Sequence, residues 1–186
     1  MATADDIIDI ADILGVTFQD DCVAAALKFF PAEAPNDTNI DEVIKKAQEN
    51  DCELMEINLN NIKHISKQKW ETLFNVLKDN NTVEAVSAAN CDLNDSIVKM
   101  LCDCLESNST IKQLNLESNS VTGKMVLDII KSTANTKGLE ELKIANQYNN
   151  MYLGSAIEYA LAEMIPKYPH LVKLGVRLEF RDFSFN

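Results

Sequence analysis

The chain has 186 residues, of which 46% are hydrophobic, enough for one domain with an appendage and a sizeable core. Its 17 basic and 29 acidic residues give a formal net charge of −12, which excludes the basic surface that nucleic-acid binding requires. Because no apolar run approaches the roughly 18 residues of a membrane-spanning helix and the start is acidic rather than signal-like, we expect a cytoplasmic protein without membrane contact.

The first 53 residues carry most of this charge, with 13 acids against three lysines. Two short amphipathic helices are predicted there, over residues 5–14 and 19–30, before a proline-containing linker. We therefore predict an acidic helical extension over residues 1–36. Helices this short are marginal alone in water, so the extension either packs on the rest of the chain, folds against a partner helix or stays flexible.

Residues 37–186 are predicted to form a second region that opens with one amphipathic helix. Over residues 39–50, the apolar side chains Ile40, Val43, Ile44 and Ala47 share one helical face, and Thr38 is a candidate N-cap. The other face is charged. This pattern is typical of a helix that covers the open end of a repeat array.

A repeat of about 28 residues fills the rest of this region. Five segments share the pattern L-x-x-L-x-L or a close variant, and they begin at Leu54, Val83, Ile111, Leu139 and Leu171. Two of them continue with a polar residue and another apolar one, as Cys91-x-Leu93 and Asn119-x-Val121, which is the leucine-rich-repeat pattern. Each segment alternates like a short strand, and the residues between segments show helical periodicity with candidate caps at Ser66, Asn94 or Asp95, Thr122 and Ser155.

These features predict an α/β fold, a right-handed leucine-rich-repeat solenoid. We expect about five short parallel strands on its concave face and helices on its convex face, because strand–helix–strand crossovers are right-handed in nearly all proteins. The acidic helices of the extension would precede this solenoid.

Chemistry-bearing residues are scarce in this sequence. The only histidines, His64 and His170, have no candidate nucleophile beside them, and there is no glycine-rich phosphate loop. The five cysteines are expected to be reduced and mostly buried. Four N-x-S/T triplets, at Asn36, Asn80, Asn94 and Asn108, are attributed to chance in a chain rich in these residues. We predict a protein that is not an enzyme and binds no cofactor or metal.

Four stretches of the sequence carry a family resemblance: Leu54-Met55-Glu56-Ile57-Asn58-Leu59-Asn60-Asn61-Ile62, Leu114-Asn115-Leu116-Glu117-Ser118-Asn119, Ile10-Ala11-Asp12-Ile13-Leu14-Gly15 and Tyr159-Ala160-Leu161-Ala162-Glu163-Met164. Together they resemble the tropomodulin/leiomodin family of actin pointed-end proteins. The resemblance runs from about Asp5 to Val176. It implies a repeat domain that docks on actin and an N-terminal helical segment that binds tropomyosin.

The resemblance also implies two sets of binding residues. The tropomyosin-binding set consists of apolar positions in the extension: Ile7, Ile10, Leu14, Val23 and Leu27. The actin-binding set lies in the loops after the strands: Asn60, Asn61, Lys63, Ser118, Asn119, Gln147 and Tyr148.

The resulting hypothesis is a monomeric, non-catalytic protein that binds or caps the actin-filament pointed end together with tropomyosin in the cytoskeleton. The alternative is a generic leucine-rich-repeat adaptor that binds another protein and not actin. Because actin and tropomyosin are themselves acidic, long-range charge attraction would not assist an extension of this composition, so binding would depend on apolar seams.

Overall fold

The computed structural model describes residues 36–148 and 153–178. The chain divides into two units between Pro35 and Asn36, and the described residues belong to the second. The expected helices of the extension, and the tropomyosin-binding residues within them, therefore lie outside the described residues.

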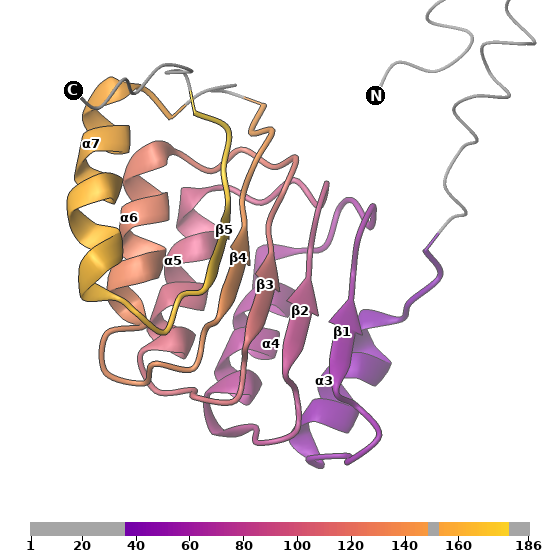
Figure 1. Ribbon diagram of the computed structural model, residues 1–186. Helices are drawn as coiled ribbons and strands as arrows, with labels where there is room; N and C mark the ends of the chain where they lie inside the picture. Colours follow the sequence, from indigo (N-terminus) through magenta and orange to yellow (C-terminus); the bar gives the residue numbers. More distant parts are fainter. Residues whose placement is uncertain (1–35, 149–152, 179–186) are drawn as a thin grey trace, which may run out of the picture. The chain divides into compact units, whose positions relative to one another are not determined.

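A single sheet of five parallel strands runs through the domain in the order β1-β2-β3-β4-β5 (Figure 1). Each strand is three residues long: β1 (Glu56–Asn58), β2 (Ala85–Ser87), β3 (Gln113–Asn115), β4 (Glu141–Lys143) and β5 (Lys173–Gly175). The central residues of neighbouring strands are in register, from Ile57 to Leu174. The predicted number and direction of the strands are confirmed.

Helices cover one face of this sheet and leave the other face open (Figure 1). They are α3 (Ile40–Gln48), α4 (Lys67–Asp79), α5 (Asp95–Leu105), α6 (Gly123–Ser132) and α7 (Ser155–Met164), which continues into the 3-10 turn η1 (Ile165–Lys167). Each helix connects two adjacent strands, except α3, which precedes β1. This is the predicted leucine-rich-repeat solenoid. No helix within the described ranges is long and apolar enough to cross a membrane.

The core lies between the sheet and the helices, where the repeat pattern places its apolar residues. Leu114 and Leu116 of the third repeat are each 1% exposed, and their equivalents in the first four repeats are similarly buried. Trp70 of α4 is fully buried and stacks on Phe74 at a ring-centroid distance of 5.4 Å. Burying each such side chain stabilises the domain by about 1.5–3 kcal/mol, so the repeats are held together mainly by shared apolar contacts.

The helix starts are set by polar caps. Ser66, Asn94 and Thr122 each accept a hydrogen bond from a backbone N–H of the first turn, as predicted. Two predictions were wrong by one residue. Asn39, not Thr38, caps α3, and Gly154, which has no side chain to cap with, precedes α7 in place of Ser155. Gly154 has φ of 85°, a conformation that favours glycine.

The two ends of the described solenoid differ in how well they are covered. At the N-terminal end, α3 buries its apolar face, and Lys69 of α4 forms an ion pair with Asp41 at 2.8 Å. The predicted capping helix is confirmed. In the last repeat, by contrast, Leu174 is only half-buried and the nearby side chain of Val172 is 81% exposed.

Candidate functional site

The turns that follow the strands repeat one backbone conformation. The third residue after each of the first four strands has a left-handed φ between 54° and 65°, and these residues are Asn61, Asn90, Ser118 and Asn146. Asparagine tolerates this region better than most residues do. Backbone hydrogen bonds continue through the turns, from Asn61 N–H to Ala89 at 2.9 Å and from Asn90 N–H to Glu117 at 3.0 Å. The turns therefore stack side by side and form a continuous edge at the C-terminal ends of the strands.

A row of buried side chains supports this edge from below. Cys91, Asn119 and Gln147 occupy the same place in successive repeats, and each donates to a carbonyl of the preceding repeat, at 2.9, 2.8 and 2.9 Å. The Asn119 side-chain oxygen also accepts from the backbone N–H groups of Cys91 and Leu93. Burial raises the pKa of the Cys91 thiol to about 11, so it remains a protonated donor at neutral pH. We call these three residues the inner row.

The inner row includes two of the predicted actin-contact residues. Asn119 is fully buried and Gln147 is 4% exposed, and both amides are engaged by backbone groups. Their side chains are therefore unavailable for a surface contact, and this part of the prediction is corrected. The polar residue at this position of a leucine-rich repeat closes the turn in which it lies. The sequence alone does not distinguish this structural role from a role in binding a partner.

The other predicted actin-contact residues lie on or beside the solvent side of the same turns. Asn61, Lys63 and Tyr148 are exposed, while Asn60 and Ser118 are half-buried. The structure adds Asn90, which the sequence analysis overlooked. Its side-chain amide donates to Asn61 at 2.8 Å, and its side-chain oxygen accepts from the Tyr148 hydroxyl. The recurrence of Asn61, Asn90 and Asn146 at one repeat position was the signal that would have revealed it.

The positions with left-handed φ, together with Tyr148, form what we call the outer row. It consists of Asn61, Asn90, Ser118, Asn146 and Tyr148. None of these side chains carries a charge at neutral pH. Inner and outer rows alternate along the same turns, one facing the core and the other facing solvent.

A second set of buried polar side chains lies in the turns before the strands. Asn108 donates to Leu77 O at 2.7 Å and accepts from the N–H groups of Thr110 and Ile111, and Asn80 makes equivalent bonds one repeat earlier. The asparagines of the four N-x-S/T triplets thus have structural roles. Asn80 and Asn108 close these turns, Asn94 caps α5, and Asn36 donates to Asn58 O and Asn60 O beside β1.

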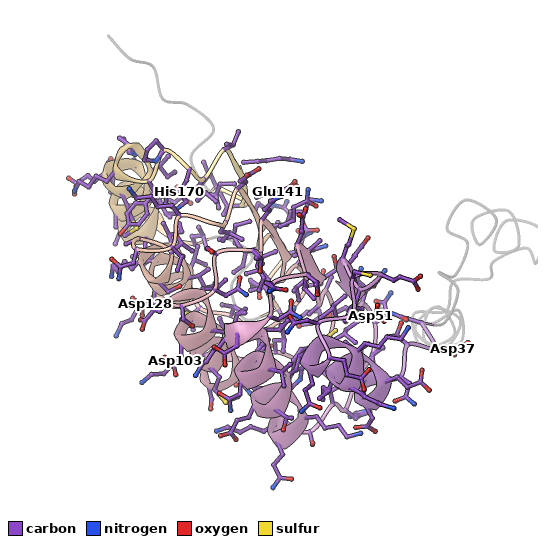
Figure 2. All side chains as sticks on the ribbon, turned by 90° about the horizontal axis from the view of Figure 1, so that it is seen from below. Asp37, Asp51, Asp103, Asp128, Glu141 and His170 are labelled. Atoms are coloured by element: carbon purple, nitrogen blue, oxygen red, sulfur yellow. The ribbon has the colours of Figure 1, made fainter. Side chains whose placement is uncertain are left out.

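The concave face carries paired charges near its C-terminal end. Glu141, labelled in Figure 2, forms ion pairs with Lys143 and Lys173 at 3.3 and 2.8 Å. The hydrogen bond from Lys173 lowers the pKa of the Glu141 carboxyl group. Lys112 pairs with Glu84 at 2.9 Å. One carboxylate is thus shared by two lysines, so this cluster carries one net positive charge, whereas the Lys112–Glu84 pair is neutral.

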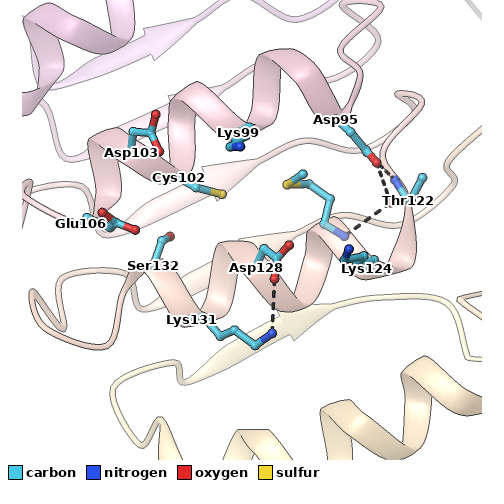
Figure 3. Close-up of a pocket in the computed structure, with 11 residues that line it drawn as sticks. Asp95, Lys99, Cys102, Asp103, Glu106, Thr122, Lys124, Asp128, Lys131 and Ser132 are labelled. Carbon is cyan, nitrogen blue, oxygen red and sulfur yellow. Dashed lines mark hydrogen bonds and ion pairs between the residues drawn. The ribbon is translucent and has the colours of Figure 1, made fainter.

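The convex face has a groove of about 480 Å³ between α5 and α6 (Figure 3). Its rim mixes acids such as Asp103 and Asp128 with lysines such as Lys99 and Lys131. Cys102 lies at its base, and burial raises the pKa of this thiol to about 12, which makes it a poor nucleophile. Within the described ranges, no group of three or more His, Cys, Asp or Glu residues is placed to hold a metal ion.

The repeat architecture has counterparts in known proteins. A family model described as the TMOD/LMOD leucine-rich domain matches residues 36–183. The chain belongs to the tropomodulin/leiomodin family. The resemblance found in the sequence is confirmed.

Relatives from this family match the chain over only part of their own length. Leiomodin-2 of Gallus gallus is 36% identical over 77% of this chain and 26% of the relative. Tropomodulin-4 of Homo sapiens is 33% identical over 78% of this chain and 41% of the relative, and the tropomodulin of Caenorhabditis elegans is 29% identical over 87% and 41%. The chain therefore spans about a quarter to two fifths of the length of these relatives.

Solved structures from the family share the fold of the described domain. The tropomodulin C-terminal domain of Caenorhabditis elegans matches with a TM-score of 0.71 and 28% identity, covering 77% of this chain and 86% of that one. The structure of leiomodin-1 actin-binding site 2 also has a TM-score of 0.71, with 31% identity, and covers 79% and 83%. This chain therefore covers more than four fifths of each of these two solved chains.

Proposed function

We propose that this chain binds the pointed end of actin filaments together with tropomyosin, as a non-catalytic capping or capping-related protein of the cytoplasmic actin cytoskeleton. The observation that carries the proposal is the match to the structure of leiomodin-1 actin-binding site 2, which covers 83% of that structure. That structure is named for actin binding, and its fold is the one described here.

The proposed actin-facing surface is the edge formed by the post-strand turns. Asn60, Asn61, Lys63, Ser118 and Tyr148 supply its accessible side chains, and the buried inner row holds the turns in place. A rigid edge loses little conformational entropy on binding, which favours affinity. Asn119 and Gln147 contribute through this support and not through contact.

A filament assay tests this proposal. Filaments with blocked barbed ends are diluted, and their depolymerisation is followed as the protein is added, with and without tropomyosin. We expect slower depolymerisation at micromolar protein, and stronger inhibition when tropomyosin is present. No inhibition in either condition would favour the alternative, a repeat adaptor that binds a protein other than actin.

The proposed tropomyosin contact is an apolar seam of Ile7, Ile10 and Leu14, extended by Val23 and Leu27. Leu14→Asp places a charge in that seam and is expected to abolish tropomyosin binding, because a buried unpaired charge is strongly unfavourable. Asp12→Ala, on the acidic side of the same predicted helix, is the matched control and should leave binding intact. Thermal unfolding of the repeat domain should be the same in both variants. Unaltered tropomyosin binding by Leu14→Asp would contradict the proposed seam.

A further inference from the structure

Tyr148 is exposed, but its backbone N–H and its side-chain hydroxyl both donate hydrogen bonds. The residue is 55% exposed, its backbone N–H donates to Asn119 O at 2.7 Å, and its hydroxyl donates to the side chain of Asn90. Asn90 follows β2, whereas Tyr148 follows β4. Because neighbouring strands lie about 4.8 Å apart, the two turns are separated by roughly 10 Å, and the side chains of Tyr148 and Asn90 together span that distance across the intervening repeat.

Asn90, which receives this hydroxyl, is itself firmly positioned. Its backbone adopts a left-handed φ of 56°, and its N–H donates to Glu117 O at 3.0 Å. Its side-chain amide donates to Asn61 at 2.8 Å, in the turn after β1. A chain of hydrogen bonds thus joins Asn61, Asn90 and Tyr148, and its far end is attached to the inner row through Asn119.

The surroundings of Tyr148 suit an aromatic anchor for a protein partner. The other outer-row side chains are three asparagines and one serine, so Tyr148 supplies the only large apolar surface among them. Tyrosine is enriched among the residues that dominate protein interfaces, because it combines apolar area with a hydrogen-bonding tip. Here the side chain is already ordered, so binding does not bear the cost of ordering it.

We infer that Tyr148 is the pre-organised anchor of protein binding at this edge and that Asn90 is its positioning residue. The inference rests on the proposed function and specifies its site: the partner is actin, which would offer a shallow apolar recess with polar groups around it. Because the outer row is uncharged, the contribution of Tyr148 to affinity is independent of salt.

The test compares the filament affinity of the full chain with that of four single variants and one double variant. Tyr148→Ala should weaken binding about 30-fold or more, as expected of an interface anchor. Tyr159→Ala is the matched control, since Tyr159 is an exposed tyrosine of α7 outside the outer row, at 62% exposure. Its affinity should stay within about twofold, as expected for a residue outside the interface core. Raising the salt concentration should leave the Tyr148→Ala ratio unchanged.

Two milder variants test the positioning role. Tyr148→Phe removes the hydroxyl, and Asn90→Gly removes its partner while retaining the left-handed backbone. Each should weaken binding about three- to tenfold, and the double variant should lose no more than either single one, because both break the same hydrogen bond. A double loss equal to the product of the single losses would overturn the positioning role.

The result that overturns the anchor is distinct from failure of the proposed function. If the unaltered chain does not bind filaments, the proposed function fails and the inference fails with it. If the unaltered chain binds and Tyr148→Ala stays within about twofold of it, or Tyr159→Ala loses as much, the inference alone fails. Urea unfolding of each variant shows whether the repeat domain remains folded.

Discussion

The inner and outer rows of the post-strand turns contain similar residues, but the inner row supports the fold and the outer row faces solvent. Asn119 of the inner row is fully buried and makes hydrogen bonds to backbone groups of two repeats. Asn61 and Asn90 of the outer row lie toward solvent and bond to other side chains. The difference shows that one turn can both hold neighbouring repeats together and present a surface, provided that alternate residues do each task.

Among the substitutions that test this comparison, Asn119→Ala is expected to have the largest effect. The substitution leaves the N–H groups of Cys91 and Leu93 and the carbonyl of Ala88 without the side chain that bonds to them. The carbonyls of Leu116 and Glu117 keep other donors. Since each buried unsatisfied group costs about 1–3 kcal/mol, we expect a loss of about 3–5 kcal/mol in the free energy of unfolding. Urea unfolding measures this loss.

Asn119→Cys is the matched control for that experiment, because cysteine occupies the same place one repeat earlier and donates from Cys91 to Leu59 O. It should recover part of the lost stability. A loss below about 1 kcal/mol for Asn119→Ala would contradict the supporting role of the inner row.

A smaller effect is expected on the opposite edge of the sheet, for Asn108→Ala. Asn108 makes two bonds as donor and accepts from Thr110 and Ile111. We expect a loss of about 2–3 kcal/mol in the free energy of unfolding. Asn108→Thr should lose less, because Thr136 fills the equivalent place in the next repeat and donates to Leu105 O. Equal losses for Ala and Thr would show that the side-chain oxygen is not what stabilises this turn.

The repeat pattern predicted the fold closely because its apolar positions are the ones that become buried. The spacing of Leu114 and Leu116 and of their equivalents determined the number of strands and the side on which the helices lie. The pattern does not identify surface roles in the same way. Asn119 and Asn90 are both polar turn residues, and only the backbone direction at each decides which one faces the core. The Asn90–Tyr148 bond joins residues 58 positions apart, a distance that local periodicity does not describe.

His170 is expected to give a modest pH dependence, since it precedes the last strand and is only half-buried. Its Nε2 atom lies 3.0 Å from the Thr133 hydroxyl, and its pKa is lowered from 6.5 by burial and by Lys137. The unfolded chain therefore binds the proton more readily than the folded chain does. The contribution of His170 to the free energy of unfolding is fully present above pH 6.5 and falls as the pH drops below that value. Urea unfolding at pH 7.5 and 5.5 should show a larger loss for the unaltered chain than for His170→Gln. An identical loss would exclude His170 as its source.

The smallest effect is expected for Asn61→Gly, which removes an outer-row side chain without disturbing the backbone. Asn61 has φ of 65°, a conformation that glycine adopts freely, and its side chain is exposed. The free energy of unfolding should change by no more than about 0.5 kcal/mol, as is usual for surface positions. Filament affinity should fall by a small factor, since Asn61 supports Tyr148 only through Asn90. A stability loss as large as that of Asn119→Ala would abolish the distinction between the two rows. A stable variant with weakened binding would show that Asn61 serves binding, whereas Asn119, at the next position of its own turn, serves only the fold.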